Sequence, residues 1–125
     1  MVTTTSRRGP TQMQMSFEYY SDSRTIVCGL IGDLDRHSFA DFAAKVTSVI
    51  RPGVDIAFDL SHIGFIDSTG LRALRASARR IQRAGGRASA ISLPPQVAHL
   101  LAVTGIDQVM SVGGRVTRSP VSYRR

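Results

Sequence analysis

Residues 54–71, VDIAFDLSHIGFIDSTGL, place an apolar run directly before the polar hinge Ile66–Leu71, IDSTGL. The stretch from Asp55 to about Asp59 predicts a short strand, and the polar pair Ser61-His62 predicts a turn after it. The hinge itself packs an acid, two hydroxyls and a glycine between an apolar segment and the next periodic one. It is therefore the first place to look for a function.

The segment after the hinge has the periodicity of an amphipathic helix. Four apolar residues fall within an arc of roughly 80 degrees at 100 degrees per residue, namely Leu71, Leu74, Ala78 and Ile81. Gly85-Gly86 predicts the C-terminal cap of this helix. Four arginines are predicted on the side away from that apolar arc, namely Arg72, Arg75, Arg79 and Arg83.

Strand and helix patterns alternate on both sides of this unit. SFEYY (16–20) and TIVCGLIG (25–32) predict two strands joined by a polar turn, and GDLD (32–35) interrupts the second. A helix is predicted from Ser38, with Ser38 and Asp41 in capping-box-like spacing and Pro52-Gly53 as its stop. The inner face expected for that helix consists of Phe39, Phe42, Ala43, Val46, Val49 and Ile50. RASAISL (87–93), PPQVAHLLAVTG (94–105) and IDQVMSV (106–112) then predict a strand, a helix and a last strand.

The resulting order, β, β, α, β, α, β, α, β, indicates an α/β domain with a mixed, mostly parallel sheet and helices packed on it. A chain of 125 residues with 42% hydrophobic content fits one such domain. We predict a disordered arm at 1–15, the domain at 16–112 and a basic tail at 113–125. In sheets of this kind, sites collect where strands end and helices begin, and the hinge lies at such a junction.

The formal charge of +7 lies mostly in the two ends of the chain. Six of the sixteen basic residues are in those ends, which hold no acid, namely Arg7, Arg8, Arg115, Arg118, Arg124 and Arg125. Between Phe17 and Val112 ten bases face nine acids. The charge therefore gives little support for direct nucleic-acid binding, since no interleaved aromatics or recognised motif accompany it.

Several other classes find no support in the sequence. No window is long and apolar enough for a membrane span and no leader is visible, so we expect a cytoplasmic protein. His37, His62 and His99 follow no ligand spacing, and neither a phosphate-binding loop nor a dinucleotide fingerprint is present, so no metal or cofactor is expected. Cys28 lies in an apolar run and is expected to be a buried thiol.

Three interpretations of the hinge remain open on physical grounds. A capping side chain at a helix start stabilises it by about 1 kcal/mol, which explains Asp67 or Ser68 but not the whole motif. A nucleophilic serine would suit a strand-to-helix turn, but FIDSTG lacks the first glycine of G-x-S-x-G, and we expect no enzyme activity. A phosphoacceptor serine is favourable because the helix start attracts a dianion.

In order and spacing, the chain resembles the STAS domain of bacterial anti-sigma factor antagonists. The resemblance covers about residues 17–112 and is carried by LIGDLD, VDIAFDLSHIGFIDSTGLRAL, RAGGRASAISL and PPQVAHLLAVTGIDQVM. The GDLD turn and DSTGL are its most specific parts. A final helix, which the family fold also has, is not recognisable in GGRVTRSPVSYRR.

The resemblance implies a partner switch that regulates transcription, as in a stress response. It implies that Ser68 is phosphorylated by an anti-sigma factor that is itself a serine kinase, and that a phosphatase resets it. Unphosphorylated, the domain would bind the anti-sigma factor and so release a sigma factor. The partner-binding residues carried over are Asp33, Asp35, Asp67, Ser68, Thr69, Gly70, Leu71 and Arg72. The main alternative is a STAS scaffold or small-ligand or nucleotide sensor that is never phosphorylated.

Two further questions stay open at this stage. The arginines on the helix after Ser68 form either a solvated face or a surface for an acidic patch on the partner. The sequence is compatible with both a monomer and a homodimer.

Overall fold

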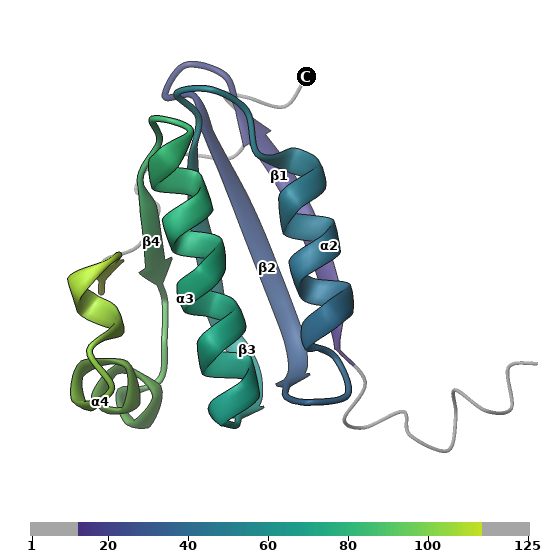
Figure 1. Ribbon diagram of the computed structural model, residues 1–125, viewed down its shortest axis with the longest axis vertical. Coiled ribbons are helices and arrows are strands. Elements are labelled where there is room, and N and C mark those ends of the chain that lie inside the picture. The colour runs from purple at the N-terminus through teal and green to yellow at the C-terminus, as the bar shows by residue number, and fades with distance from the viewer. Residues whose placement is uncertain (1–12, 114–125) are drawn as a thin grey trace, which may run out of the picture.

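The computed structural model describes residues 13–113, along which strands and helices alternate (Figure 1). The strands are β1 (Gln14–Tyr20), β2 (Thr25–Leu34), β3 (Asp55–Ile66), β4 (Ala88–Ile91) and β5 (Ser111–Val112). The helices are α2 (Phe39–Val49), α3 (Ser68–Arg83) and α4 (Pro95–Val103), followed by the short 3-10 helix η2 (Ile106–Gln108). This order confirms the predicted alternation.

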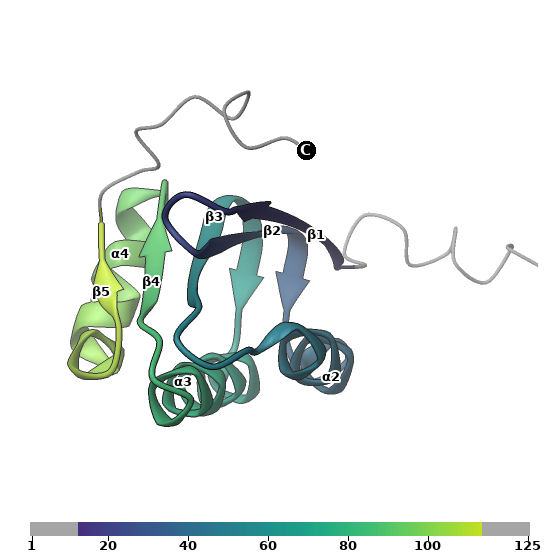
Figure 2. The same ribbon diagram turned by 90° about the horizontal axis from the view of Figure 1, so that it is seen from above.

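The strands form one sheet in the order β1-β2-β3-β4-β5. β1 and β2 pair antiparallel, and every later neighbour pairs parallel. The helices α2 and α3 lie together on one face of the sheet, and α4 lies by the β4–β5 edge (Figure 2). The predicted α/β class with a mixed, mostly parallel sheet is confirmed.

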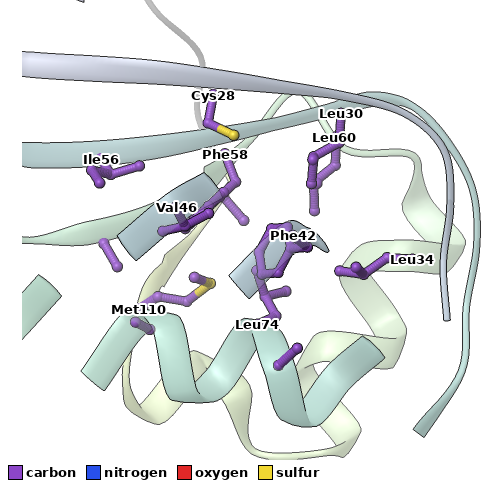
Figure 3. Packing of buried hydrophobic residues seen from close by; sticks show 14 of the residues in the cluster. Cys28, Leu30, Leu34, Phe42, Val46, Ile56, Phe58, Leu60, Leu74 and Met110 are labelled. Atoms are coloured by element: carbon purple, nitrogen blue, oxygen red, sulfur yellow. The ribbon is translucent and has the colours of Figure 1, made fainter. Parts of the chain in front are cut away.

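The core lies between the sheet and the helices (Figure 3). Phe42 of α2 packs against Phe58 of β3 with ring centroids 5.8 Å apart, and Leu74 of α3 is fully buried beside them. Cys28 is also fully buried, as predicted, and burial raises the pKa of its thiol to about 12. Because the thiolate is the reactive form, this cysteine is chemically inert at neutral pH.

The predicted turn at Ser61-His62 is wrong, because β3 continues through it to Ile66. The pairing of β2 with β3 shifts register between Gly29 and Ile31, where β3 carries an extra residue. Ser61 therefore lies in a bulge, and His62 directly after it pairs with Ile31. β2 likewise continues beyond Gly32 to Leu34, which is fully buried and pairs with Ile66. Both strands therefore reach further toward the hinge than their sequences suggest.

The ends of the described part also differ from the sequence boundaries. β1 begins at Gln14, and Met13 before it is buried in the core cluster. Only Ser111–Val112 of the predicted last strand is a strand, since Ile106–Gln108 forms a 3-10 turn. The predicted arm over residues 1–12, the predicted tail over 114–125 and the question of a final helix there lie outside the described residues.

Candidate functional site

The site lies where β2 and β3 end and where α2 and α3 begin, at the lower end of Figure 1. The last residues of the two strands are paired, Asp33 with Phe65 and Leu34 with Ile66. Parallel strands place their carboxyl ends at one edge, so the acidic turn at the end of β2, which contains Asp33 and Asp35, meets the hinge at the end of β3. The amide of Asp67 donates to the carbonyl of Leu34 at 3.3 Å and joins the two segments directly.

Asp67 is the N-cap of α3 and uses its two carboxylate oxygens for different purposes. Oδ1 accepts a hydrogen bond from the amide of Gly70 at 2.8 Å, inside the helix start. Oδ2 accepts one from the amide of Arg36 at 3.1 Å, across the site. The Gly70 amide, followed by that of Arg36, lowers the pKa of Asp67, so the carboxylate is charged at neutral pH. One side chain therefore caps the helix and ties the acidic segment to it.

Ser68 is the first residue of α3, and it is exposed. Within residues 13–113 no hydrogen bond occupies its hydroxyl, because the capping role belongs to Asp67. The first turn of a helix has unpaired amide donors and a positive dipole end, which favour a negative group there. The hydroxyl is thus accessible, and it lies where the amide donors and dipole of the helix start would stabilise a phosphate.

Gly70 is buried against the end of β2. A Cβ at this position would overlap the backbone carbonyl of Leu34, a group that a side-chain rotation cannot move away. The glycine therefore lets α3 begin in direct contact with β2. The glycine was visible in the DSTGL motif, but the structure shows that a glycine is needed there because of packing within the domain.

Ser38 stabilises the acidic turn at the end of β2 through two hydrogen bonds to its backbone. Ser38 Oγ donates to the carbonyl of Asp33 at 2.8 Å and accepts from the amide of Asp35 at 3.0 Å. The predicted capping box at Ser38 and Asp41 is wrong, since the Ser38 side chain makes no capping hydrogen bond to α2. The hydroxyl stabilises the turn that precedes the helix instead of the helix start.

The two acids of this turn have different environments. Asp35 Oδ1 accepts from the amide of His37 at 2.9 Å. Asp33 lies in the last part of β2, and burial, with a smaller contribution from Asp35, raises its carboxyl pKa. Ionised Asp33 is thus disfavoured by its surroundings, and any further negative charge placed nearby adds to that effect.

The remaining residues assigned from the sequence divide into exposed and packed ones. Arg72 is exposed and Thr69 is half-buried, whereas half-buried Leu71 packs against the core cluster. The arginine series is not uniform either: Arg79 and Arg83 are exposed, but Arg75 is half-buried, with its Nε fully buried. Of the two alternatives left open for the four arginines, a fully solvated face therefore does not hold at Arg75.

Sequence reasoning missed three contributors to this end of the molecule. Arg36 acts through its backbone amide, which no side-chain motif reports. Phe39 was predicted on the inner face of α2, but 39% of it is exposed, because the helix starts beyond the edge of the core. Arg80 reaches from α3 to α2 and donates to Thr47 Oγ1 at 2.9 Å. The helical pattern alone could not have shown that Arg80 faces α2, because that depends on how the two helices pack together.

Within residues 13–113, no helix is long and apolar enough to cross a membrane. The same residues contain no group of three or more histidine, cysteine, aspartate or glutamate side chains placed to hold a metal ion.

The chain belongs to the STAS domain family, since the family model described as Mlab, STAS domain matches residues 18–117. It is 19% identical over 103 residues to the anti-sigma-B factor antagonist of Bacillus subtilis (strain 168), covering 82% of this chain and 94% of that relative. The resemblance to the anti-sigma factor antagonists of this family is thereby confirmed.

Solved structures show the same fold. The crystal structure of an anti-sigma factor antagonist from Mycobacterium paratuberculosis matches with a TM-score of 0.74 at 19% identity, over 93% of this chain and 97% of that chain. The Bacillus cell fate determinant SpoIIAA in its phosphorylated form matches with a TM-score of 0.60 at 22% identity, over 81% of this chain and 92% of that chain.

Proposed function

We propose that this protein is an anti-sigma factor antagonist whose switch is phosphorylation of Ser68. In the unphosphorylated form it binds an anti-sigma factor and so frees a sigma factor. The observation that carries the proposal is the exposed hydroxyl of Ser68 at the start of α3, which makes no hydrogen bond within residues 13–113. Both carboxylate oxygens of the neighbouring Asp67 are already hydrogen-bonded. The relationship to proteins named anti-sigma factor antagonists supports it.

The effect of the phosphate follows from charge. A phosphoserine carries between one and a half and two negative charges and would stand in the contact surface, close to the segment that holds Asp33 and Asp35. Bringing a partner onto that surface then requires desolvating the phosphate and opposing any acid of the partner. A penalty of about 3 kcal/mol weakens binding by more than about a hundredfold.

The partners implied are an anti-sigma factor that is a serine kinase and a phosphatase that resets Ser68. The exchange takes place in the cytoplasm, without a cofactor and without direct contact to nucleic acid. The protein is a regulatory substrate and binding module rather than an enzyme. The contact surface includes the exposed or half-buried members of the assigned set, namely Asp33, Asp35, Asp67, Ser68, Thr69, Leu71 and Arg72.

Intact-mass spectrometry tests the modification site. The purified full chain is incubated with ATP and each anti-sigma factor kinase encoded in the same genome, together with Ser68→Ala and Thr69→Ala. We expect one added phosphate in the wild type and in Thr69→Ala, and none in Ser68→Ala. Thr69 is the matched control because it is the neighbouring hydroxyl in the same helix turn.

Ser68→Asp separates the proposal from the competing hypothesis of an unphosphorylated scaffold or sensor. Under the switch, Ser68→Asp weakens the kinase complex strongly while Ser68→Ala keeps it. Complexes that form equally well with both variants, together with no added phosphate in the wild type, would favour the scaffold.

A further inference from the structure

A groove runs between α2 and α3 directly beside the Ser68 turn. Its walls are Phe39 and Ala43 of α2 and Ala73 and Ala76 of α3. These residues explain the hollow: α2 contributes a phenylalanine at its first turn, but the facing positions hold alanines that do not fill the space between the helices. The groove has a volume of about 320 Å³. An apolar cavity of about 150 Å³ already admits benzene, so an aromatic side chain fits here.

Thr69 links the groove to the phosphorylation site. It follows Ser68 in the chain and also lines the groove. Ser77 lies about one turn beyond Ala73 and about two turns beyond Thr69 on the same face of α3. Its buried side chain lines the groove as well. A partner that covers Ser68 therefore extends into the groove without a break.

The charge around the groove is of one sign. Arg72 and Arg80 both line it and are both exposed. They are eight residues apart on α3, about 12 Å along the helix axis. Among the described residues 13–113 no acid lines the groove, and α3 contains none. Asp41, the acid of α2, is paired with Lys45 at 3.1 Å. The apolar pocket is thus flanked by two cations without a local counterion in the groove.

We propose that the α2–α3 groove receives an apolar, preferably aromatic, side chain of the anti-sigma factor, flanked by carboxylates that pair with Arg72 and Arg80. This proposal rests on the proposed function for the identity of the partner, and it adds the chemistry by which the partner is chosen. The apolar side chain contributes affinity by burial, and the arginines select a partner segment that carries acids on both sides of it.

The groove chemistry is tested first without any kinase. The ¹⁵N-labelled full chain is titrated with the blocked peptide Glu-Phe-Glu, with the charge-swapped Lys-Phe-Lys, and with Glu-Ala-Glu. We expect amide shifts at Ala43, Ala73 and Ser77 with Glu-Phe-Glu, and binding weaker by at least about fivefold for each of the other two peptides. Shifts that are absent from the groove, or equal for all three peptides, overturn the proposal.

The second test measures the complex with the kinase that the mass experiment identifies. Arg80→Glu is compared with Arg83→Glu, which makes the same charge change on an exposed residue of α3 outside the groove. We expect Arg80→Glu to weaken binding by about tenfold or more and Arg83→Glu by less than about twofold. Equal effects mean that only the overall charge matters for binding. They refute the proposed partner contact in the groove but leave the proposed function intact.

A steric pair completes the test. Ala76→Trp fills the groove, and Ala102→Trp places the same side chain on an exposed position of α4. Circular dichroism confirms that both variants fold, and only Ala76→Trp should weaken the complex. If the wild type binds no kinase at all, the proposed function fails. The peptide titration alone then decides whether the groove binds an aromatic side chain flanked by acids.

Discussion

The starts of α2 and α3 lie at the same end of the sheet but use their capping residues in opposite ways (Figure 1). At α3, Asp67 caps its own helix and also holds the Arg36 amide. At α2, Ser38 makes no capping hydrogen bond and holds Asp33 and Asp35 instead. Both residue types favour N-caps, yet only one of them acts as a cap here.

The difference leaves the Ser68 side chain exposed at the start of α3, whereas the Ser38 side chain stabilises the turn before α2. Asp67 satisfies the helix, so the adjacent Ser68 hydroxyl is left unbonded within the described chain. Ser38 stabilises the acidic turn, and the Arg36 amide directly after that turn donates to Asp67. Four variants of these residues and their neighbours test the comparison.

The largest effect is expected at Gly70, where α3 touches β2. Gly70→Ala would drive a Cβ into the Leu34 carbonyl, and we expect a loss of about 3 kcal/mol of unfolding free energy. Chemical denaturation measures it. Gly64→Ala is the control at the same end of the sheet. The only close contact of its Cβ would be with Oδ1 of Asp33, at 2.6 Å, which a side-chain rotation can move, and the Gly32 carbonyl lies at an ordinary 3.7 Å. Its cost should stay below about 1 kcal/mol, and an equal cost for both would refute the backbone-contact argument.

Next in size is the contrast between the two capping positions. We expect Asp67→Ala to lower Tm by roughly 5–10 °C, because it leaves the amides of Gly70 and Arg36 without their acceptor. Ser38→Ala should lower Tm by roughly 3–6 °C, since it removes two hydrogen bonds in a turn but no helix cap. Thermal unfolding followed by circular dichroism checks both. The reverse order would show that the acidic turn, rather than the α3 start, determines stability at this end.

The smallest effect concerns pH and tests the contribution of the Asp67 charge, which the amides of Gly70 and Arg36 stabilise. In Asp67→Asn the amide oxygen still caps α3, but the NH₂ group cannot accept from the Arg36 amide. The folded-state pKa of Asp67 is lowered, so its stabilising contribution is complete above the unfolded pKa of about 3.9 and is lost as pH falls through the folded pKa.

Tm measured for wild type and Asp67→Asn between pH 7 and pH 3 should therefore show a gap that is widest at neutral pH and narrows below about pH 4. Asp107→Asn, in η2, controls for the change in net charge. A gap that does not depend on pH would show that the Asp67 charge contributes nothing.

Much of this fold was predictable because it depends on local patterns. The arc of Leu71, Leu74, Ala78 and Ile81 predicted the buried face of α3, and all but half-buried Leu71 are buried. The double glycine predicted its end, where Gly85 has a φ of 89°. The strand lengths were not predictable, since the continuation of β3 through Ser61-His62 depends on a bulge against β2. A bulge belongs to the pairing of two strands rather than to either sequence.

The sequence by itself determined the order of the elements, the buried Cys28 and the position of the hinge, because periodicity and turn residues act over a few neighbours. Only the tertiary structure decided that Asp67 rather than Ser68 caps α3, that Ser38 serves the acidic turn, and that Phe39 stands beside a groove. Each of these outcomes depends on a group from another segment, such as the Arg36 amide or the Leu34 carbonyl, whose approach is fixed by the packing of α2, α3 and the sheet.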